Sequence, residues 1–214
     1  MDKSQVAVDV FDRHAHEYQR KFMDVGLYHA SFDLFCDHVI RKNADILEIA
    51  CGPGNITRYL LEKRPDFKIL GIDLSVNMLH LAKINNPAAE FQLMDARDIG
   101  RLDKKYAAIM CGFCLPYLSK EEAIRFITDA SGLLTASGVL YISTMEDDYS
   151  KSGYRASSSG DEMYMYYHQA DYLTQALQEN GFTIIDLRRQ DYPTQDGTKT
   201  IDLLIIAGKK AESR

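Results

Sequence analysis

The sequence contains no tryptophan, few cysteines and prolines, and no apolar run long enough to cross a membrane. Among its 214 residues, four are cysteine and five are proline. Four cysteines in a chain of this length are too sparse for a disulfide framework, so we expect reduced thiols. The uncharged residues 106–118 contain Gly112 and Pro116 and fall short of the roughly 18 to 20 residues of a spanning helix.

Positive charge is also scarce, because 25 Lys and Arg stand against 31 Asp and Glu, which gives a formal net charge of −6. Proteins that bind nucleic acid gain most of their affinity from Lys and Arg that neutralise phosphates. Anionic membrane surfaces likewise attract basic segments. We therefore expect no nucleic-acid partner and no membrane partner. The first residues lack the basic and apolar segments of a signal peptide, and we expect a cytoplasmic protein.

What the sequence does contain is a regular alternation of short apolar runs with longer helical patterns. This order is typical of a parallel sheet with crossover helices. The first forty residues have helical spacing, and a final pair of apolar runs is joined by the turn-rich residues 191–197, which predicts an antiparallel hairpin. The predicted strands are residues 45–50, 68–73, 90–94, 106–111, 139–144, 182–187 and 201–207.

Local signals mark several boundaries of these elements. Ser75 is a predicted N-cap, Ser119 and Glu122 have the spacing of a capping box, and Asn180-Gly181 suits the end of the last helix. Ser137-Gly138 is expected to turn into the fifth strand. The polar residues 146–161, which include Ser157-Ser158-Ser159-Gly160, are interpreted as a loop or lid.

The first strand ends in the turn Cys51-Gly52-Pro53-Gly54. Glycines after a parallel strand let the backbone approach a ligand, and ligands of open α/β sheets bind beyond the carboxyl ends of the strands. A dinucleotide fingerprint would need a third glycine where Thr57 stands. An NAD(P)-dependent oxidoreductase is therefore the weaker alternative, although Asp73 could still bind a ribose.

Acidic residues accompany three successive strands. Glu48 lies within the first strand, Asp73 ends the second, and Asp95 follows the third. Because the carboxyl ends of parallel strands meet at one edge of a sheet, we expect these carboxylates to converge on one crevice. Such a crevice suits a cationic or hydroxyl-rich ligand better than a pyrophosphate.

These motifs resemble the class I S-adenosylmethionine-dependent methyltransferases. Residues 47–54 are similar to the first motif of that family, with Ala50 where glycine is usual, and residues 71–75 are similar to the next motif. Met94-Asp95-Ala96 is similar to the adenine-binding segment, and residues 131–140 to the helix that leads into strand five. The resemblance covers about residues 40–210. It implies a Rossmann-like, doubly wound α/β/α fold with a seven-stranded, mainly parallel sheet and an antiparallel last strand.

The resemblance also implies S-adenosyl-L-methionine as cofactor and a role for individual residues. The Asp73 carboxylate would bind both ribose hydroxyls, and Asp95 and Ala96 would bind adenine. The segment from Phe11 to Tyr18 is similar to a helix that covers the cofactor, which places Tyr18 near its methionine end. The implied cofactor-binding residues are Tyr18, Glu48, Ala50, Cys51, Gly52, Gly54, Asp73, Leu74, Met78, Asp95, Ala96, Cys111 and Phe113.

In this family the end of strand four usually faces the methyl group. Here Leu115-Pro116-Tyr117 echoes enzymes that methylate nucleic-acid amines, but Cys114 stands where those enzymes carry Asn or Asp. We therefore predict a small-molecule acceptor. A general base is needed only if the nucleophile is protonated, so no catalytic residue is assigned. The candidates are Tyr117 and, in the tyrosine-rich residues 149–172, Tyr154 and His168.

The predicted organisation is one methyltransferase domain over residues 1–214, as a monomer or homodimer. Its parts are a helical cover (1–43), a cofactor-binding core (44–145), a lid-like insertion (146–170), and a closing helix and hairpin (171–214). Cys111 and Cys114 have the spacing of a redox pair, but Cys111 ends a strand instead of beginning a helix. No second pair completes a metal site, so we predict no metal. A non-catalytic S-adenosylmethionine-binding module remains a further alternative.

Overall fold

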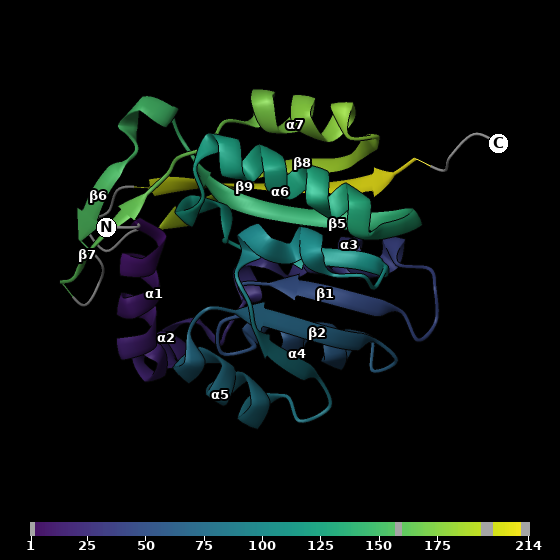
Figure 1. Cartoon of the computed structure of the whole chain (residues 1–214), viewed down its shortest axis with the longest axis horizontal. Helices are drawn as coiled ribbons and strands as arrows, with labels where there is room; N and C mark the ends of the chain where they lie inside the picture. Colours follow the sequence, from purple (N-terminus) through teal and green to yellow (C-terminus); the bar gives the residue numbers. More distant parts are fainter. Residues whose placement is uncertain (1–2, 157–159, 194–198, 211–214) are drawn as a thin grey trace.

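A seven-stranded sheet forms the centre of the protein, in the order β3-β2-β1-β4-β5-β9-β8 (Figure 1). The structure is a computed structural model that describes residues 3–156, 160–193 and 199–210. Only β9 runs against the other strands, because it pairs antiparallel with both β5 and β8. The predicted α/β fold with a reversed last strand is confirmed. The strands in sheet order are β3 (Glu90–Leu93), β2 (Lys68–Asp73), β1 (Asp45–Ile49), β4 (Tyr106–Cys111), β5 (Leu134–Glu146), β9 (Lys199–Lys209) and β8 (Phe182–Pro193).

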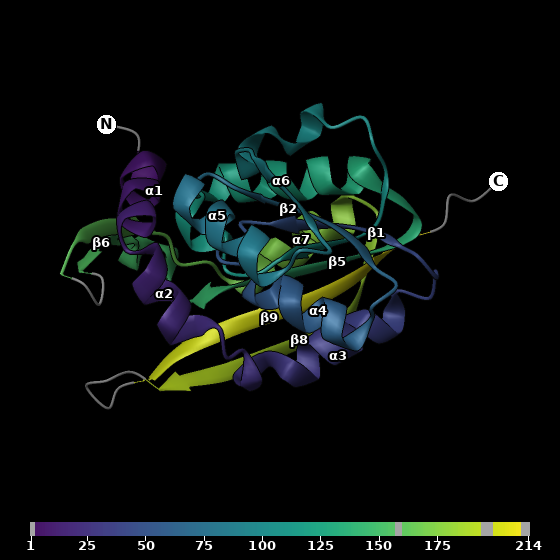
Figure 2. The same cartoon turned by 90° about the horizontal axis from the view of Figure 1, so that it is seen from below.

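Helices cover both faces of this sheet, which gives the three layers seen in Figures 1 and 2. Side chains alternate along each strand, so neighbouring residues enter opposite cores. Leu47 and Ile49 pack with α6 (Lys120–Leu133) and α7 (Ala170–Glu179). Ile46 packs on the other face with α3 and α4. The remaining main helices are α3 (His29–His38), α4 (Asn55–Lys63) and α5 (Val76–Asn85).

The predicted helix boundaries are confirmed by their hydrogen bonds. The Ser75 side chain accepts a bond from the Met78 backbone N–H at the start of α5. Ser119 and Glu122 form a complete capping box at the start of α6. Gly181 follows α7 in the left-handed conformation, with φ +82°. The caps fix where helices begin and end, and therefore where the connecting loops reach the edge of the sheet.

Two predicted boundaries around the strands are wrong. Strand β5 begins at Leu134 rather than after Ser137-Gly138, because these two residues lie in an irregular part of the ladder between β4 and β5. Strand β8 extends to Pro193, so the first residues of the predicted turn at 191–197 are paired with β9. Residues 194–197 of that turn lie outside the described residues.

The interpretation of residues 146–161 as an irregular loop is also wrong in part. A short helix, η4 (Tyr149–Lys151), is followed by β6 (Gly153–Ala156), which pairs antiparallel with β7 (Glu162–Met165). Tyr154 pairs with Tyr164 across this ribbon, and Met163 and Met165 pair with Arg155 and Gly153, which the polar composition of the segment had obscured. Ser157, Ser158 and Ser159 lie outside the described residues.

The predicted helical cover at the N-terminus is divided into short helices: α1 (Lys3–Arg13), α2 (Ala15–Phe22) and η1 (Gly26–Tyr28). Ala7 and Val10 of α1 pack on Met163 of β7, and Figure 1 shows α1 beside this ribbon. Ala15 of α2 packs on Met78 of α5. The cover is therefore held at two places, by β7 through α1 and by α5 through α2.

Among the described residues, no helix has the length and apolarity required to cross a membrane. Within the same residues, no group of three or more His, Cys, Asp or Glu side chains is arranged to hold a metal ion.

We expect Gly54→Ala to destabilise the fold by about 2 to 4 kcal/mol. Gly54 has φ +78°, and an added Cβ would overlap the buried Asn86 amide, which donates to the Gly54 carbonyl at 2.9 Å. Gly181→Ala is the matched control, because Gly181 has φ +82° but open space around the added atom. Gly181→Ala should lower the free energy of unfolding by only about 1 kcal/mol. Chemical denaturation measures both values, and equal losses would refute the packing role of Gly54.

Candidate functional site

A cleft opens where β1, β2 and β4 end, beneath the cover helices α1 and α2. It encloses about 870 Å³ of space, including its open mouth. Small-molecule sites typically have volumes of about 300 to 1,000 Å³. The lining residues are Ser4, Ala7, Val8, Phe11, Tyr18, Ala50, Gly52, Asp73, Leu74, Met78, Met94, Asp95, Ala96, Arg97, Gly112, Phe113, Cys114, Tyr117 and Leu118.

Nine of the thirteen predicted cofactor-binding residues line this cleft. The chain brings them together because the first, second, third and fourth strands end at the same edge of the sheet. The nine are Tyr18, Ala50, Gly52, Asp73, Leu74, Met78, Asp95, Ala96 and Phe113. Their role toward a cofactor stays a prediction.

The turn after β1 approaches the cleft in left-handed conformations. Ala50 has φ 52° and Gly52 has φ 53°. An alanine adopts this region at a cost of roughly 1 to 2 kcal/mol, so Ala50 is strained where the resemblance leads us to expect glycine. An added Cβ on Gly52 would lie 3.8 Å from the Tyr18 ring, which is an ordinary contact. Glycine is therefore favoured at position 52 by conformation, and its bare backbone leaves room for a ligand below Tyr18.

Asp73 is the half-buried carboxylate at the centre of the cleft. Its Oδ2 accepts a hydrogen bond from the Gly52 N–H at 2.9 Å, and its Oδ1 accepts one from the Ser75 N–H at 2.8 Å. Burial raises the pKa of Asp73, while these backbone N–H groups lower it. Each carboxylate oxygen has two lone pairs, so both can accept a further bond from a ligand hydroxyl.

The implied cofactor fits these residues. Asp73 offers oriented acceptors to a ribose, and Leu74, Met78 and Ala96 offer an apolar surface to a purine ring. Gly52 leaves the backbone open for the remaining part of the ligand. A polar edge with an apolar slot is the usual composition of a nucleoside pocket.

Glu48 does not line the cleft, which corrects its predicted place among three converging carboxylates. It is 1% exposed and accepts a bond from the Thr57 hydroxyl at 2.5 Å. Its other oxygen, Oε1, is buried without a partner among the described residues. Burial raises the pKa of Glu48 to about 8, so the group is largely neutral at pH 7. The alternation of side chains along β1 turns Glu48 toward α4, and Thr57 replaces the third glycine of a dinucleotide motif.

Three other predicted residues also lie outside the lining. Gly54 is the N-cap of α4 and contacts α5. Cys51 and Cys111 are buried, at 2% and 0% exposure. Burial raises the pKa of both thiols well above the ordinary value, so neither is a reactive thiolate. These residues shape the turn and the core behind the cleft.

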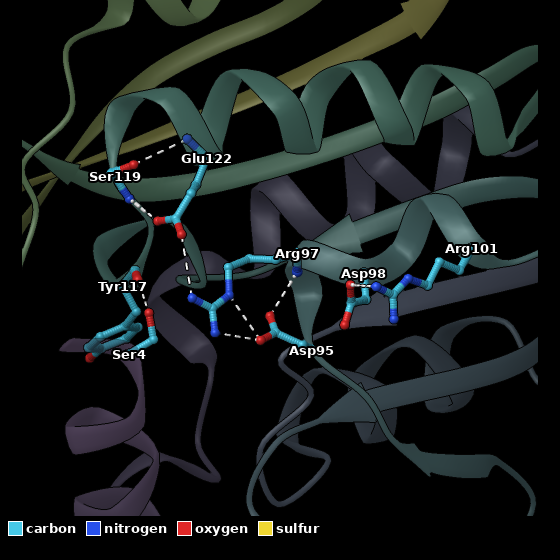
Figure 3. A network of polar contacts seen from close by, with 8 residues as sticks. All are labelled: Ser4, Asp95, Arg97, Asp98, Arg101, Tyr117, Ser119 and Glu122. Carbon is cyan, nitrogen blue, oxygen red and sulfur yellow. Dashed lines mark hydrogen bonds and ion pairs between the residues drawn. The ribbon is translucent and has the colours of Figure 1, made fainter. Parts of the chain in front are cut away.

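Asp95 is held by a neighbour that the sequence analysis missed, Arg97 (Figure 3). Oδ1 of Asp95 accepts from the Arg97 backbone N–H at 2.8 Å, and Oδ2 accepts from Nε at 2.9 Å and Nη2 at 2.6 Å. Nη1 of Arg97 reaches Oε1 of Glu122 at 3.4 Å. This contact joins η2 (Ala96–Arg101) to the capping box of α6. The only sequence signal for it is a basic residue two positions after an acid.

Of the three catalytic candidates, Tyr117 of η3 (Leu115–Tyr117) lines the cleft. His168 does not, because it is 0% exposed and both ring nitrogens are engaged, Nε2 with the Leu115 carbonyl at 2.8 Å and Nδ1 with the Tyr172 hydroxyl. Burial lowers its pKa, and we interpret it as a neutral structural histidine.

Tyr154 also lies away from the cleft. It is 55% exposed on β6, and its ring packs edge-on against Tyr164 at 5.3 Å between centroids. A tyrosine-rich composition did not distinguish ribbon packing from pocket lining. The predictions of His168 and Tyr154 as catalytic residues are therefore not supported by their positions.

Residues 46–138 match a family model described as a methyltransferase domain. A putative methyltransferase, 235L, of Invertebrate iridescent virus 6 is 33% identical over 104 residues, which are 48% of this chain and 38% of that protein. A demethylmenaquinone methyltransferase of Thermotoga maritima is 28% identical over 139 residues, 64% of this chain and 60% of that protein. The chain thus spans less than two thirds of the length of these relatives.

Solved structures share the fold over almost the whole chain. The DhpI complex with SAH has a TM-score of 0.74 at 18% identity and covers 99% of this chain and 98% of that one. The 1,6-didemethyltoxoflavin-N1-methyltransferase of Burkholderia thailandensis, solved with S-adenosylhomocysteine, has a TM-score of 0.71 at 20% identity, with coverage of 96% and 88%. At these identities the likeness establishes the architecture.

We expect Glu48→Gln to remove a pH dependence of stability. The pKa of Glu48 is raised to about 8 in the folded protein, whereas a glutamate in an unfolded chain has a pKa of about 4.3. The unfolded chain therefore releases this proton first, and the free energy of unfolding of the wild type falls as pH rises between these values. Denaturant unfolding at a series of pH values should show that Glu48→Gln lacks this fall.

Thr57→Val is the companion variant, because it keeps the carboxyl group and removes the hydroxyl donor. The free energy of unfolding of Thr57→Val should be about 1 kcal/mol lower than that of the wild type, and its pH dependence should remain. If wild type and Glu48→Gln lose stability in parallel across the range, the buried neutral carboxyl is the wrong description.

Proposed function

We propose that the whole protein methylates a small-molecule acceptor. The chain belongs to the class I S-adenosylmethionine-dependent methyltransferases, and its residues 46–138 match the methyltransferase domain. One observation carries this proposal. Asp73 is held by the Gly52 and Ser75 backbone N–H groups in an otherwise mostly apolar cleft. An oriented carboxylate beside an open glycine turn is suited to a ribose that continues into an amino-acid chain.

The residues of the chain bind and orient the two reactants. We assign Asp73 to the ribose hydroxyls, and Leu74, Met78 and Ala96 to the adenine. S-adenosyl-L-methionine, when bound, supplies a methyl group on a positively charged sulfur that is already activated toward a nucleophile. The main task of the protein is therefore to align the acceptor and exclude water. Phe11 and Tyr18 of the cover close the cleft from above.

We propose that Asp95 lies beside the adenine, as expected from the sequence, with its carboxylate already paired to Arg97. Its carboxylate is fixed by Arg97, so its orientation does not depend on the ligand. Oδ1, which among the described residues accepts the Arg97 backbone N–H, retains a lone pair that can accept from an exocyclic amine. The Ala96 backbone N–H lies in the same segment.

A small-molecule acceptor is supported by charge and by relatives. The net charge of −6 disfavours a polyanion. Relatives are named for demethylmenaquinone and trans-aconitate, which are small molecules. The four cysteines are free thiols, and we propose that the protein works as a monomer or homodimer in a reducing compartment such as the cytoplasm. We also propose that residues 1–214 act as one domain.

We expect Asp73→Asn to weaken the binding of S-adenosylhomocysteine by about tenfold or more, because the ribose loses charge-assisted hydrogen bonds. Isothermal titration calorimetry measures the dissociation constant. Asp45→Asn is the matched control, since Asp45 begins β1 at the opposite edge of the sheet and bonds Lys104. Wild-type affinity in Asp73→Asn, with an unchanged thermal midpoint, would overturn the ribose assignment. Absence of binding to the wild type would overturn the function.

A further inference from the structure

Four aromatic side chains line the cleft, and we call them the aromatic chamber: Phe11, Tyr18, Phe113 and Tyr117. They come from α1, α2, the end of β4 and η3, so the chain assembles them only when folded. The Phe11 ring packs edge-on against Tyr18 at 5.6 Å and against Tyr117 at 5.2 Å between centroids. Edge-on packing leaves ring faces available to a flat ligand.

Phe113 is kept in a strained conformation in this chamber. Its φ is 55°, a value that bulky residues rarely adopt. Its backbone N–H donates to the Ser143 hydroxyl at 2.9 Å, and its ring packs on Tyr28 at 5.2 Å. Tyr28 is in turn fixed by a 2.7 Å bond from its hydroxyl to Asp202. Backbone strain that the surroundings hold in place is typical of functional sites, and Phe113 lies at the wall of the cleft.

The chamber also contains two hydroxyl groups available to a ligand. Those of Tyr18 and Tyr117 have no hydrogen-bond partner among the described residues, and both side chains line the cleft. Burial raises the pKa of Tyr18 to about 12 and raises that of Tyr117 as well. Both phenols therefore stay protonated and offer neutral hydrogen bonds, not a base.

The charges around the chamber disfavour an anionic acceptor. Among the described lining residues the only cationic side chain is Arg97, which Asp95 and Glu122 already engage. Asp95 offsets the charge of Arg97, and Asp73 adds a further negative charge to the cleft. A polycarboxylate would bring further negative charge into it without a cation to receive it.

The same residues provide no evident proton acceptor for the nucleophile. No histidine lines the described cleft, and its two carboxylates, Asp73 and Asp95, are assigned to the ribose and the adenine of the proposed cofactor. An acceptor atom that carries a proton at neutral pH would need such a base. An acceptor atom that already has a free lone pair needs no base.

Building on the proposed function, we propose that the acceptor is a planar nitrogen heterocycle without negative charge, methylated at an unprotonated ring nitrogen inside the aromatic chamber. The nitrogen lone pair forms the new N–CH₃ bond while the C–S bond to the methyl group breaks. The electron pair of the broken C–S bond stays on sulfur, which gives S-adenosylhomocysteine. Positive charge passes from sulfur to the ring, so no base is consumed. The aromatic faces and the negative cleft stabilise that charge. Where the acceptor carries a second polar group, the Tyr117 hydroxyl bonds it and so orients the ring.

The test compares three classes of probe acceptor with S-adenosyl-L-methionine and the full-length protein. Isoquinoline and nicotinamide represent planar nitrogen heterocycles, 2-naphthol represents a planar ring that needs a base, and trans-aconitate and malonate represent carboxylates. Mass spectrometry identifies the methylated product, and initial rates give kcat/KM. The heterocycles should exceed both other classes by about tenfold or more, as expected for an electrostatic preference of at least about 1.4 kcal/mol.

Variants separate orientation by Tyr117 from a general effect on folding. Tyr117→Phe should raise the KM for nicotinamide, whose carboxamide is the second polar group, by about fivefold to tenfold, the loss expected for one neutral hydrogen bond, with a smaller change in kcat. The KM for isoquinoline, which has no second polar atom, should not change. The exposed Tyr154→Phe is the matched control and should behave like the wild type. An unchanged KM for nicotinamide in Tyr117→Phe overturns the assignment of its hydroxyl.

Transfer that favours the carboxylates or 2-naphthol, or no transfer to either heterocycle, overturns the inferred acceptor class. Calorimetry with S-adenosylhomocysteine on the same sample keeps the two proposals distinct. Binding without heterocycle methylation refutes the acceptor class and leaves the proposed function standing. Absence of binding refutes the proposed function itself.

Discussion

The hydrogen bonds between Asp73 and the turn after β1 are the interaction on which the cleft depends. One carboxylate accepts from Gly52 in the first turn and from Ser75 at the start of α5, so it joins the ends of β1 and β2. The bonds orient the carboxylate, and they also hold Gly52 in its left-handed conformation. Without this connection, the open backbone of the turn and the acceptor for a ribose would not lie in a fixed relation to one another.

The walls of the cleft are set by segments far apart in the chain. Asp12 at the end of α1 accepts a bond from the Ser75 hydroxyl at 2.7 Å, which anchors the cover to the same cap that Asp73 contacts. On the other side, Arg97 connects Asp95 to Glu122 and so ties the third strand's end to α6 (Figure 3). The apolar contacts of Phe11 then close the space between these anchors. Polar bonds fix the frame, while aromatic side chains form the surface that a ligand meets.

Much of this arrangement follows from local patterns, because strand and helix periodicities, caps and the glycine turn act over a few residues. These signals predicted the sheet, its reversed last strand and the place of Asp73. What they did not predict depends on side-chain direction and on distant partners. Glu48 faces α4 because of its register in β1. His168 is hydrogen-bonded to Leu115 and Tyr172, and Arg97 contacts Glu122, which lies 25 positions further along the chain. The ribbon of β6 and β7 was missed because its residues are paired with each other rather than with the main sheet.

The central claim is that Asp73, Gly52 and the aromatic chamber surround one bound nucleoside sulfide. A crystal structure of the protein with S-adenosylhomocysteine tests it most directly. The account predicts both ribose hydroxyls within about 3.2 Å of the Asp73 oxygens, the adenine against Leu74 and Met78, and the sulfur facing Phe113 and Tyr117. A ligand bound at another edge of the sheet, or a ribose without contact to Asp73, would contradict it.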